Sequence, residues 1–331
     1  ELSQQFELCG VSADSTVTVL SNELSEEDFK SAVLLALEKI GCQLVPLTIP
    51  FGNRQSFADL LNHKSASLAF SRADLVIDLT QNIDNAHMAQ LPLRETRVLA
   101  IDKTVANNPQ YLMTSTGIVK RAKKVAGLLT DGGHVFISSP SGTQISFDLA
   151  DCAIKEETGV PSEKGTMATW SSGSIELFPD GNNINAEIIV MPGDIILEAQ
   201  HIVKSPVRLE IARGNVVEVQ GESSDANLIK AQLEYHPSSE DAYAFRSVCL
   251  GLRLHPGPEH KGPFDRNKTK GVHSCSTAGW VTLTTGSKDQ LALSLTITNA
   301  SIMVENVQIF SNGKLSASLS PDIYELAALD L

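Results

Sequence analysis

Hydrophobic and polar positions follow two different periods in the first part of the chain. Residues 16–20, Thr-Val-Thr-Val-Leu, form a short β-rich run, and a helical run follows in which apolar residues return every three or four positions. Ser25 and Asp28 fit a capping box, in which the Ser25 hydroxyl accepts hydrogen bonds from the first helical amides. Gly41 is the expected C-cap. The apolar face of this helix is made of Phe29, Val33, Leu37 and Ile40.

Further β-rich and helical runs continue this alternation up to about residue 140. Residues 118–129 are rich in Ala, Lys and Leu, which favour a helix. Strands that alternate with helices along a chain form a parallel sheet with helices on both faces. We therefore predict an α/β N-terminal domain with a parallel sheet over residues 1–140. Its remaining strands are expected at residues 43–49, 73–79, 97–101 and 134–138.

The pattern changes after about residue 140, where short β runs are separated by Gly, Pro and Asn. Arg213-Gly214-Asn215 has the chemistry of a hairpin turn between two such runs. These features predict an α+β domain with a mainly antiparallel sheet over residues 141–331. Strands are expected at residues 189–197, 207–211 and 215–220, and a helix at residues 225–235 with an extension over 241–245.

Composition and charge narrow the class of protein. With 331 residues, of which 42% are hydrophobic and 20% charged, the chain can bury a substantial core. A net charge of −13 argues against a nucleic-acid partner, because phosphate binding needs clustered Lys and Arg. No apolar stretch approaches the ~20 residues that cross a bilayer, and residues 1–7 lack a signal-peptide pattern. We therefore expect a cytoplasmic protein with no membrane partner.

The cysteines form no recognisable framework in the sequence. They are odd in number, widely scattered and without CxxC spacing, so neither a set of disulfides nor a structural zinc site is indicated. We expect reduced, mostly buried thiols. The five residues are Cys9, Cys42, Cys152, Cys249 and Cys275.

Several short blocks resemble one enzyme family. The main blocks are Met191-Pro-Gly-Asp-Ile-Ile-Leu197, Ser205-Pro-Val-Arg-Leu-Glu-Ile211 with Gly214, Asp241-Ala-Tyr-Ala-Phe245 and Gly251-Leu252. Supporting blocks are Trp170-Ser-Ser-Gly173, Asp265-Arg266 with Gly271, Thr284-Thr285-Gly286 and Asn312-Gly313. Their order and spacing resemble the 2,5-dihydroxypyridine 5,6-dioxygenases over nearly the whole chain. The resemblance implies a fold related to bacterial metalloaminopeptidases, a homo-oligomer, and a small planar heterocyclic or aromatic acid as substrate.

The resemblance also implies a metal site, and the matching positions lack its ligands. The family holds Fe(II) through one His and a His-x-Asp pair, which leave positions open for substrate and oxygen. The first His falls at Ser247, and the pair falls at Asn299 and Ser301. Hydroxyls and a carboxamide supply neither the imidazole basicity nor the negative charge that holds Fe(II). We therefore expect no iron cofactor at these positions.

Two other metal sites can be considered. The acidic ligands of the aminopeptidase relatives fall at Met167 or Ala168 and at the same serine, although their mid-domain His matches His273. His255 and His260 are spaced for ligation and are weak metal candidates. Pro and Gly dominate their segment, so a surface loop with two solvated imidazoles is the simpler interpretation.

Metal-free chemistry is the next interpretation of the matched positions. If the chain has the family fold, the matched residues Ser247, Asn299 and Ser301 would lie near one pocket together with His273. A Ser beside a His is the minimum for an activated nucleophile or an acid/base pair. His273 can equally be a hydrogen-bonded loop histidine. The candidate catalytic residues are His273, Ser247, Ser301 and Asn299.

Candidate substrate-binding residues come from two segments. Asp84 and His87 follow the third strand, and open α/β sheets bind ligands beyond the carboxyl ends of their strands. Trp170, with Ser171 beside it, and Trp280 can stack on a planar substrate, although core packing is the safer expectation for a Trp.

The sequence therefore predicts a diverged small-molecule enzyme that resembles the ring-cleaving dioxygenases but does not use the family iron site. The alternatives are a catalytically silent paralogue that serves as a binding or structural partner, and a metallo-hydrolase of aminopeptidase type. The expected partners are a small-molecule ligand and further copies of the chain, or a homologue in a hetero-oligomer.

Overall fold

The computed structural model describes residues 2–49, 64–80, 93–101, 116–130, 132–170, 172–180, 184–254, 274–287 and 291–321, with residues 323, 325 and 326. The chain divides into two compact units. One comprises Glu1–Val119, Glu157–Ser172 and Thr269–Val272, and the other comprises Lys120–Glu156, Gly173–Lys268 and His273–Leu331. The division expected after residue 140 differs from this one, because residues 120–140 belong to the second unit and residues 157–172 belong to the first.

The first unit is built on a parallel sheet with the strand order β2-β1-β3-β4-β8. Its strands are β1 (Thr16–Ser21), β2 (Gln43–Thr48), β3 (Leu75–Asp78), β4 (Arg97–Ala100) and β8 (Met167–Thr169). Its helices are α1 (Leu2–Leu8), α2 (Glu27–Ile40), α4 (Lys64–Arg72) and the single-turn η1 (Leu93–Glu95). The predicted parallel α/β sheet is confirmed, whereas α1, α4 and β8 were not predicted. The strand expected in it at residues 134–138 belongs instead to an antiparallel sheet of the second unit.

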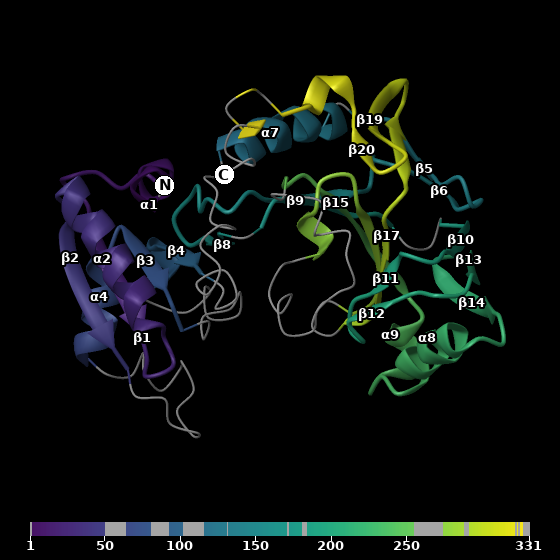
Figure 1. Cartoon of the computed structure of the whole chain (residues 1–331), viewed down its shortest axis with the longest axis horizontal. Helices are drawn as coiled ribbons and strands as arrows, with labels where there is room; N and C mark the ends of the chain where they lie inside the picture. The colour runs from purple at the N-terminus through teal and green to yellow at the C-terminus, as the bar shows by residue number, and fades with distance from the viewer. Residues whose placement is uncertain are drawn as a thin grey trace. The chain divides into compact units, whose positions relative to one another are not determined.

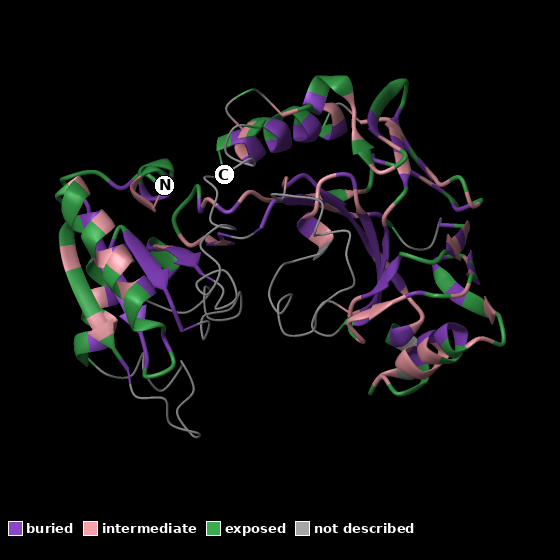
Figure 2. Ribbon diagram, in the orientation of Figure 1, coloured by how far each residue is buried: buried purple, intermediate pink, exposed green. Residues whose placement is uncertain are grey.

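Two separate apolar clusters cover the two faces of this sheet. Figure 1 shows α2 and α4 beside its strands, and Figure 2 shows that β3 is buried. Alternate strand residues such as Val17 and Val19 pack with Phe6 of α1 and with the apolar face of α2. The intervening positions, such as Val76 and Val98, pack with Phe70 of α4. Helices therefore lie on both faces, as the period of the sequence predicts.

The start of α2 corrects one prediction. Its N-cap is Glu26, whose side chain makes no capping hydrogen bond. The Ser25 hydroxyl instead accepts from the Asn22 amide at 3.0 Å and donates to the Leu79 carbonyl at 3.3 Å. The capping box is wrong because Ser25 is buried in the turn that leaves β1, where other backbone groups use its hydroxyl. The predicted C-cap at Gly41 is confirmed, with φ 86°.

The second unit is built on two sheets whose described strand pairs are antiparallel, which confirms the predicted class. The eight-stranded sheet has the order β14-β13-β10-β6-β5-β18-β19-β20 and the seven-stranded sheet has the order β12-β11-β17-β16-β15-β9-β7. One apolar cluster draws residues from both sheets and from α7 (Thr116–Thr130), so the sheets share a core.

The strands of the eight-stranded sheet are β5 (His134–Ser138), β6 (Gln144–Asp148), β10 (Ala186–Val190), β13 (Val207–Ala212), β14 (Asn215–Gln220), β18 (Ser301–Val304), β19 (Val307–Ser311) and β20 (Lys314–Leu315). Those of the seven-stranded sheet are β7 (Ala153–Glu157), β9 (Ser174–Phe178), β11 (Ile195–Ile196), β12 (His201–Ile202), β15 (Phe245–Gly251), β16 (Val281–Gly286) and β17 (Leu291–Ile297). Short 3-10 turns are η5 (Ser274–Ser276) and η6 (Ala317–Leu319).

Helix α8 (Ser224–Glu234) confirms the predicted helix, and the Ser223 hydroxyl caps it by accepting from the Ala226 amide. The predicted extension over 241–245 is wrong. A separate turn of helix, α9 (Ser239–Ala242), covers only its first two residues. Phe245 begins β15, and its amide donates to the Gly214 carbonyl at 2.7 Å. Among the described residues, no helix is long and apolar enough to span a membrane.

Two apolar runs that look continuous in the sequence each pass from one sheet to the other. The run predicted over 189–197 is split into β10, in the eight-stranded sheet, and β11, in the seven-stranded sheet. The run from Leu291 is split in the same way between β17 and β18. We call residues 191–194 the first crossover and residues 298–300 the second crossover.

Candidate functional site

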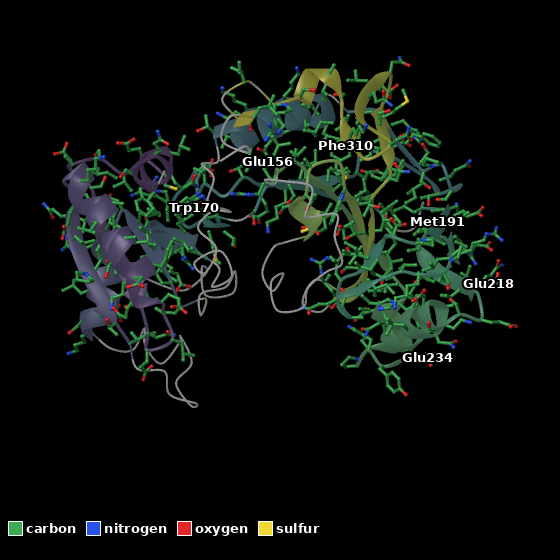
Figure 3. The ribbon with its side chains drawn as sticks, viewed as in Figure 1. Glu156, Trp170, Met191, Glu218, Glu234 and Phe310 are labelled. Carbon is green, nitrogen blue, oxygen red and sulfur yellow. The ribbon has the colours of Figure 1, made fainter. Side chains whose placement is uncertain are left out.

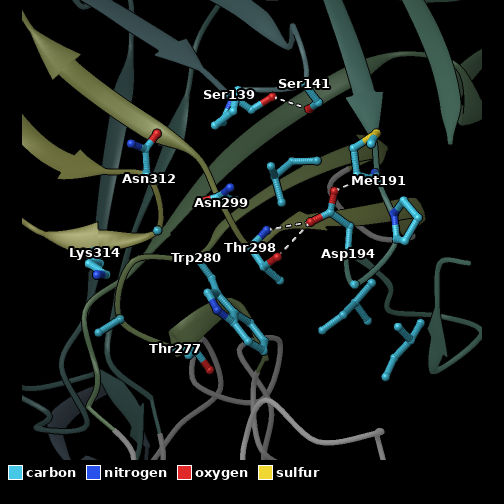
Figure 4. Close-up of a pocket in the computed structure, with 18 of the residues that line it drawn as sticks. Ser139, Ser141, Met191, Asp194, Thr277, Trp280, Thr298, Asn299, Asn312 and Lys314 are labelled. Carbon is cyan, nitrogen blue, oxygen red and sulfur yellow. Dashed lines mark hydrogen bonds between the residues drawn. The ribbon is translucent and has the colours of Figure 1, made fainter. Parts of the chain in front are cut away.

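A cavity of about 920 Å³ lies in the second unit, where the two crossovers meet (Figure 4). Its walls come from the β5–β6 turn at 139–141, both crossovers, the β19–β20 turn, and the segment 277–280 before β16. The walls are therefore formed mainly by connections between strands, which a shared core holds in place.

One buried carboxylate joins the two crossovers. Asp194 is 4% exposed and accepts the Met191 amide at 2.8 Å, which closes the Met-Pro-Gly-Asp turn. Its other oxygen accepts the Thr298 amide at 2.8 Å and the Thr298 hydroxyl at 3.0 Å. Burial raises the pKa of Asp194, and the hydrogen bonds from Thr298 and Met191 oppose this rise only in part. Asp194 thereby fixes the backbone that carries Asn299.

The β19–β20 turn packs directly on the second crossover. Asn312 and Gly313 both have positive φ, 47° and 72°, as two-residue hairpin turns require. The Gly313 amide donates to the Ala300 carbonyl at 2.8 Å, and a Cβ on Gly313 would lie 2.3 Å from the Thr298 carbonyl oxygen. Only glycine allows this close approach of two backbones.

Trp280 supplies an aromatic surface in the cavity wall (Figure 4). Its amide donates to the Thr277 carbonyl at 3.0 Å, and its carbonyl accepts the Gly251 amide at 3.0 Å. The preceding Gly279 has φ 86°, and a Cβ there would lie 2.1 Å from the Gly313 carbonyl oxygen. The segment before β16 is therefore held between the end of β15 and the β19–β20 turn.

The structure brings two of the predicted site residues together. Asn299 is exposed and lines the cavity. Ser301 is half-buried at the start of β18, where its hydroxyl accepts the Asn312 amide at 2.8 Å and donates to the Asn312 carboxamide oxygen at 3.3 Å. Asn312 itself lines the cavity, so Ser301 supports its wall.

Ser247 lies elsewhere in the second unit. It is fully buried on β15, and its hydroxyl donates to Glu176 at 2.7 Å and also contacts the Thr284 hydroxyl. It is not among the described residues that line the cavity. The structure thus places Ser247 apart from the cavity wall that carries Asn299.

Ser247 belongs to a polar face of the seven-stranded sheet. Side chains alternate between the two faces of a strand, and the opposite face is apolar and packs into the core. The hydroxyls bond to one another across the strands, as Thr282 and Thr296 do at 2.8 Å. The residues of this polar face are Ser174, Glu176, Ser247, Cys249, Thr282, Thr284, Ser294 and Thr296.

The remaining predicted residues fall in two groups. Trp170 is fully buried in the core of the first unit, with its ring centroid 6.1 Å from that of Phe6 in an edge-on arrangement (Figure 3). Core packing of this kind accounts for a Trp at this position, so no stacked ligand is needed to explain it. The residues that lie outside the described part of the chain are His273, Asp84, His87, Ser171, His255 and His260.

Two features of the cavity were missed at the level of sequence. Asp194 appeared only as one residue of the Met-Pro-Gly-Asp block, and its role depends on a partner more than a hundred positions away in the chain. The basic residues Arg253 and Lys314 also line the cavity. Among the residues that the structure describes, no group of three or more His, Cys, Asp or Glu could hold a metal ion.

Comparisons with known proteins agree with this architecture. The family described as 2,5-dihydroxypyridine 5,6-dioxygenase matches residues 1–317. The 2,5-dihydroxypyridine 5,6-dioxygenase of Pseudomonas putida KT2440 is 22% identical over 282 residues, which cover 81% of this chain and 80% of that protein.

Two solved structures share the fold. The structure of 2,5-dihydroxypyridine dioxygenase from Pseudomonas putida KT2440 superposes with a TM-score of 0.78 at 19% identity, covering 96% of both chains. Wild-type AmpT from Thermus thermophilus superposes with a TM-score of 0.53 at 10% identity, covering 96% of this chain and 99% of that one. The predicted resemblance is confirmed, and the fold is that of these structures.

Proposed function

This chain belongs to the 2,5-dihydroxypyridine 5,6-dioxygenase family, and from that membership we propose that it is a diverged small-molecule enzyme that does not use Fe(II) at the family positions. Its substrate class is a small planar heterocyclic or aromatic acid. The cavity at the two crossovers is its binding site.

The polar side chains in the cavity wall are the main support for this proposal. A silent paralogue could fill its old site with apolar side chains, but here Asn299, Asn312 and Asp194 line the walls. Asp194 already accepts from both crossovers, and the exposed Asn299 side chain can bond to water or to a polar ligand in the cavity. Trp280 offers a flat surface for a planar ring.

The charges in the wall support an acidic ligand. Arg253 and Lys314 line the cavity. Burial and the neighbouring charge of Arg121 lower the pKa of Arg253 to about 10, which leaves its guanidinium protonated at neutral pH. The only acidic side chain among the described lining residues is Asp194, whose oxygens already accept from both crossovers. The balance of charge in the wall favours an anion.

The residues at the matched metal positions do not fit Fe(II). They offer two hydroxyls and a carboxamide in place of two imidazoles and a carboxylate. The Ser247 and Ser301 hydroxyls are already hydrogen-bonded to Glu176 and Asn312. We therefore derive no step through iron at these positions, and the family chemistry is not carried over to this chain.

Ligand binding tests the proposal. Pyridine and benzene carboxylates should bind the full chain in isothermal titration calorimetry, and Trp280→Ala should weaken binding roughly tenfold because it removes the stacking surface. Tyr235→Ala is the matched control, since Tyr235 is 86% exposed and lies outside the cavity wall.

Two outcomes would count against the proposal. If none of these acids binds, or if both variants bind as the wild type does, the cavity is not the binding site. If a bound acid is recovered unchanged after long incubation, the chain binds without turnover and the silent paralogue becomes the better interpretation.

A further inference from the structure

Two cysteines that are distant in the sequence lie next to each other in the second unit. Cys249 lies on the polar face of the seven-stranded sheet, and Cys275 lies in η5. The Cys249 sulfur is 3.6 Å from the Cys275 carbonyl oxygen, and the two thiols are close enough for each to shift the pKa of the other. Neither forms a disulfide, so the pair is a dithiol.

The backbone holds this dithiol in place. The Arg253 amide donates to the Ser276 carbonyl at 2.8 Å, and the Ala278 amide donates to the Arg253 carbonyl at 2.7 Å. A Cβ on Gly251 would lie 2.0 Å from the Thr277 carbonyl oxygen and 2.9 Å from that of Cys275. The absence of a side chain at Gly251 therefore lets η5 pack directly on the end of β15, beside Cys249.

The two thiols differ in access and in acidity. Cys249 is 6% exposed, whereas Cys275 is half-buried. The hydrogen bond from the Cys249 thiol lowers the pKa of Cys275, and the same bond together with burial raises the pKa of Cys249. A more accessible, more acidic thiol beside a buried one is the arrangement in which the first attacks and the second resolves.

We propose that Cys275 and Cys249 form a thiol–disulfide exchange site whose substrate is a low-molecular-weight disulfide. The Cys275 thiolate attacks one sulfur, forming a mixed disulfide and releasing the other half of the reagent as a thiolate, which takes up a proton. The Cys249 sulfur then loses its proton and attacks Cys275, which breaks the mixed disulfide and releases the second thiol. Overall the protein loses two protons and two electrons, and the reagent takes up both to become two thiols.

The other cysteines have different surroundings. Burial raises the pKa of Cys9 to about 12, with the nearby charge of Arg97 opposing it. Burial also raises the pKa of Cys42 and of Cys152. Thiols of higher pKa hold less thiolate at neutral pH and react more slowly. The exchange should therefore be selective for Cys275 and independent of whether the cavity binds an aromatic acid.

Oxidised glutathione tests this on the reduced full chain. Peptide mapping should find one new disulfide, between Cys249 and Cys275, with release of two glutathione molecules per chain. Cys249→Ser should trap glutathione on Cys275, and Cys275→Ser should abolish the fast reaction. Cys42→Ser is the matched control and should react like the wild type.

The wild-type map does not depend on how well any variant folds. A disulfide or a stable adduct at Cys9, Cys42 or Cys152 in place of the predicted bond would overturn the proposal. A wild-type protein that keeps glutathione on Cys275 without forming the bond to Cys249 would also overturn it.

Discussion

At the residue scale, Asp194 shows how one side chain can define a site. It is buried, and its two oxygens accept hydrogen bonds from Met191 in the first crossover and from Thr298 in the second. A buried carboxylate is costly unless such bonds compensate for the lost water. Burial raises the pKa of Asp194 by more than these hydrogen bonds lower it. Asp194 is therefore a positioning residue whose charge the fold only partly stabilises.

A pH dependence follows from the direction of that shift. Above the ordinary value of 3.8, and up to the raised pKa, the folded state keeps a proton on Asp194 that the unfolded chain has lost. The contribution of Asp194 to stability is therefore largest below 3.8 and falls as the pH rises through this window. Asp194→Asn cannot titrate, so the unfolding free energy of the wild type minus that of the variant should decrease over the same window.

Urea unfolding of both proteins at a series of pH values above 3.8 measures this difference. Asp148→Asn, at a residue that is exposed on β6, controls for the general effect of the substitution. A difference that stays constant, or that grows with rising pH, would contradict the assignment.

At the element scale, the cavity depends on backbones that approach each other closely. The β19–β20 turn touches the second crossover through Gly313, and Gly279 touches that turn in the same way. These contacts join a turn of the eight-stranded sheet to a connection of the seven-stranded sheet. The position of Asn312 in the wall follows from them, since it precedes Gly313 in the same turn.

Gly313→Ala tests this packing against a matched glycine. Gly132 also has a left-handed φ, 79°, but no described atom lies within 4 Å of a Cβ built there. Gly132→Ala should cost only the conformational strain, about 1 kcal/mol. Gly313→Ala adds a clash with the Thr298 carbonyl and should cost about 3 kcal/mol or more. Unfolding free energies from urea titration measure both, and equal losses would refute the close-packing argument.

At the scale of the whole molecule, two units with separate cores divide the chain, and family membership extends across both. The candidate cavity and the dithiol lie in the second unit, whereas Trp170 is part of the core of the first. The histidines that the sequence offers as possible metal ligands, His255, His260 and His273, lie outside the described residues.

Metal content should therefore be measured on the intact protein. We expect no stoichiometric iron at the family positions and no Fe(II)-dependent oxygen uptake with 2,5-dihydroxypyridine, because Ser247, Asn299 and Ser301 replace the ligands. Elemental analysis, oxygen-electrode assays and anomalous scattering together check this. Iron bound by these three residues would disprove the expectation.

The sequence by itself determined the classes of element and the family. The spacing of apolar residues predicted α2 and the strands β1 to β5, β13 and β14, because elements that pack on a core carry apolar residues at regular intervals. The predicted helix cap was less reliable. The Ser25 hydroxyl accepts a hydrogen bond from the Asn22 amide in a buried turn and does not cap α2. Ordered blocks such as Met191 to Leu197 were enough to indicate the family that the comparisons show.

Only the tertiary structure decided how the site is assembled. The sequence placed Ser247 with Asn299 and Ser301, but register puts Ser247 on a polar sheet face beside Glu176 and leaves Asn299 on the cavity wall. Pairings such as Asp194 with Thr298, or Cys249 with Cys275, join residues that are far apart in the chain. No local pattern encodes them, because they exist only once both sheets have packed around their common core.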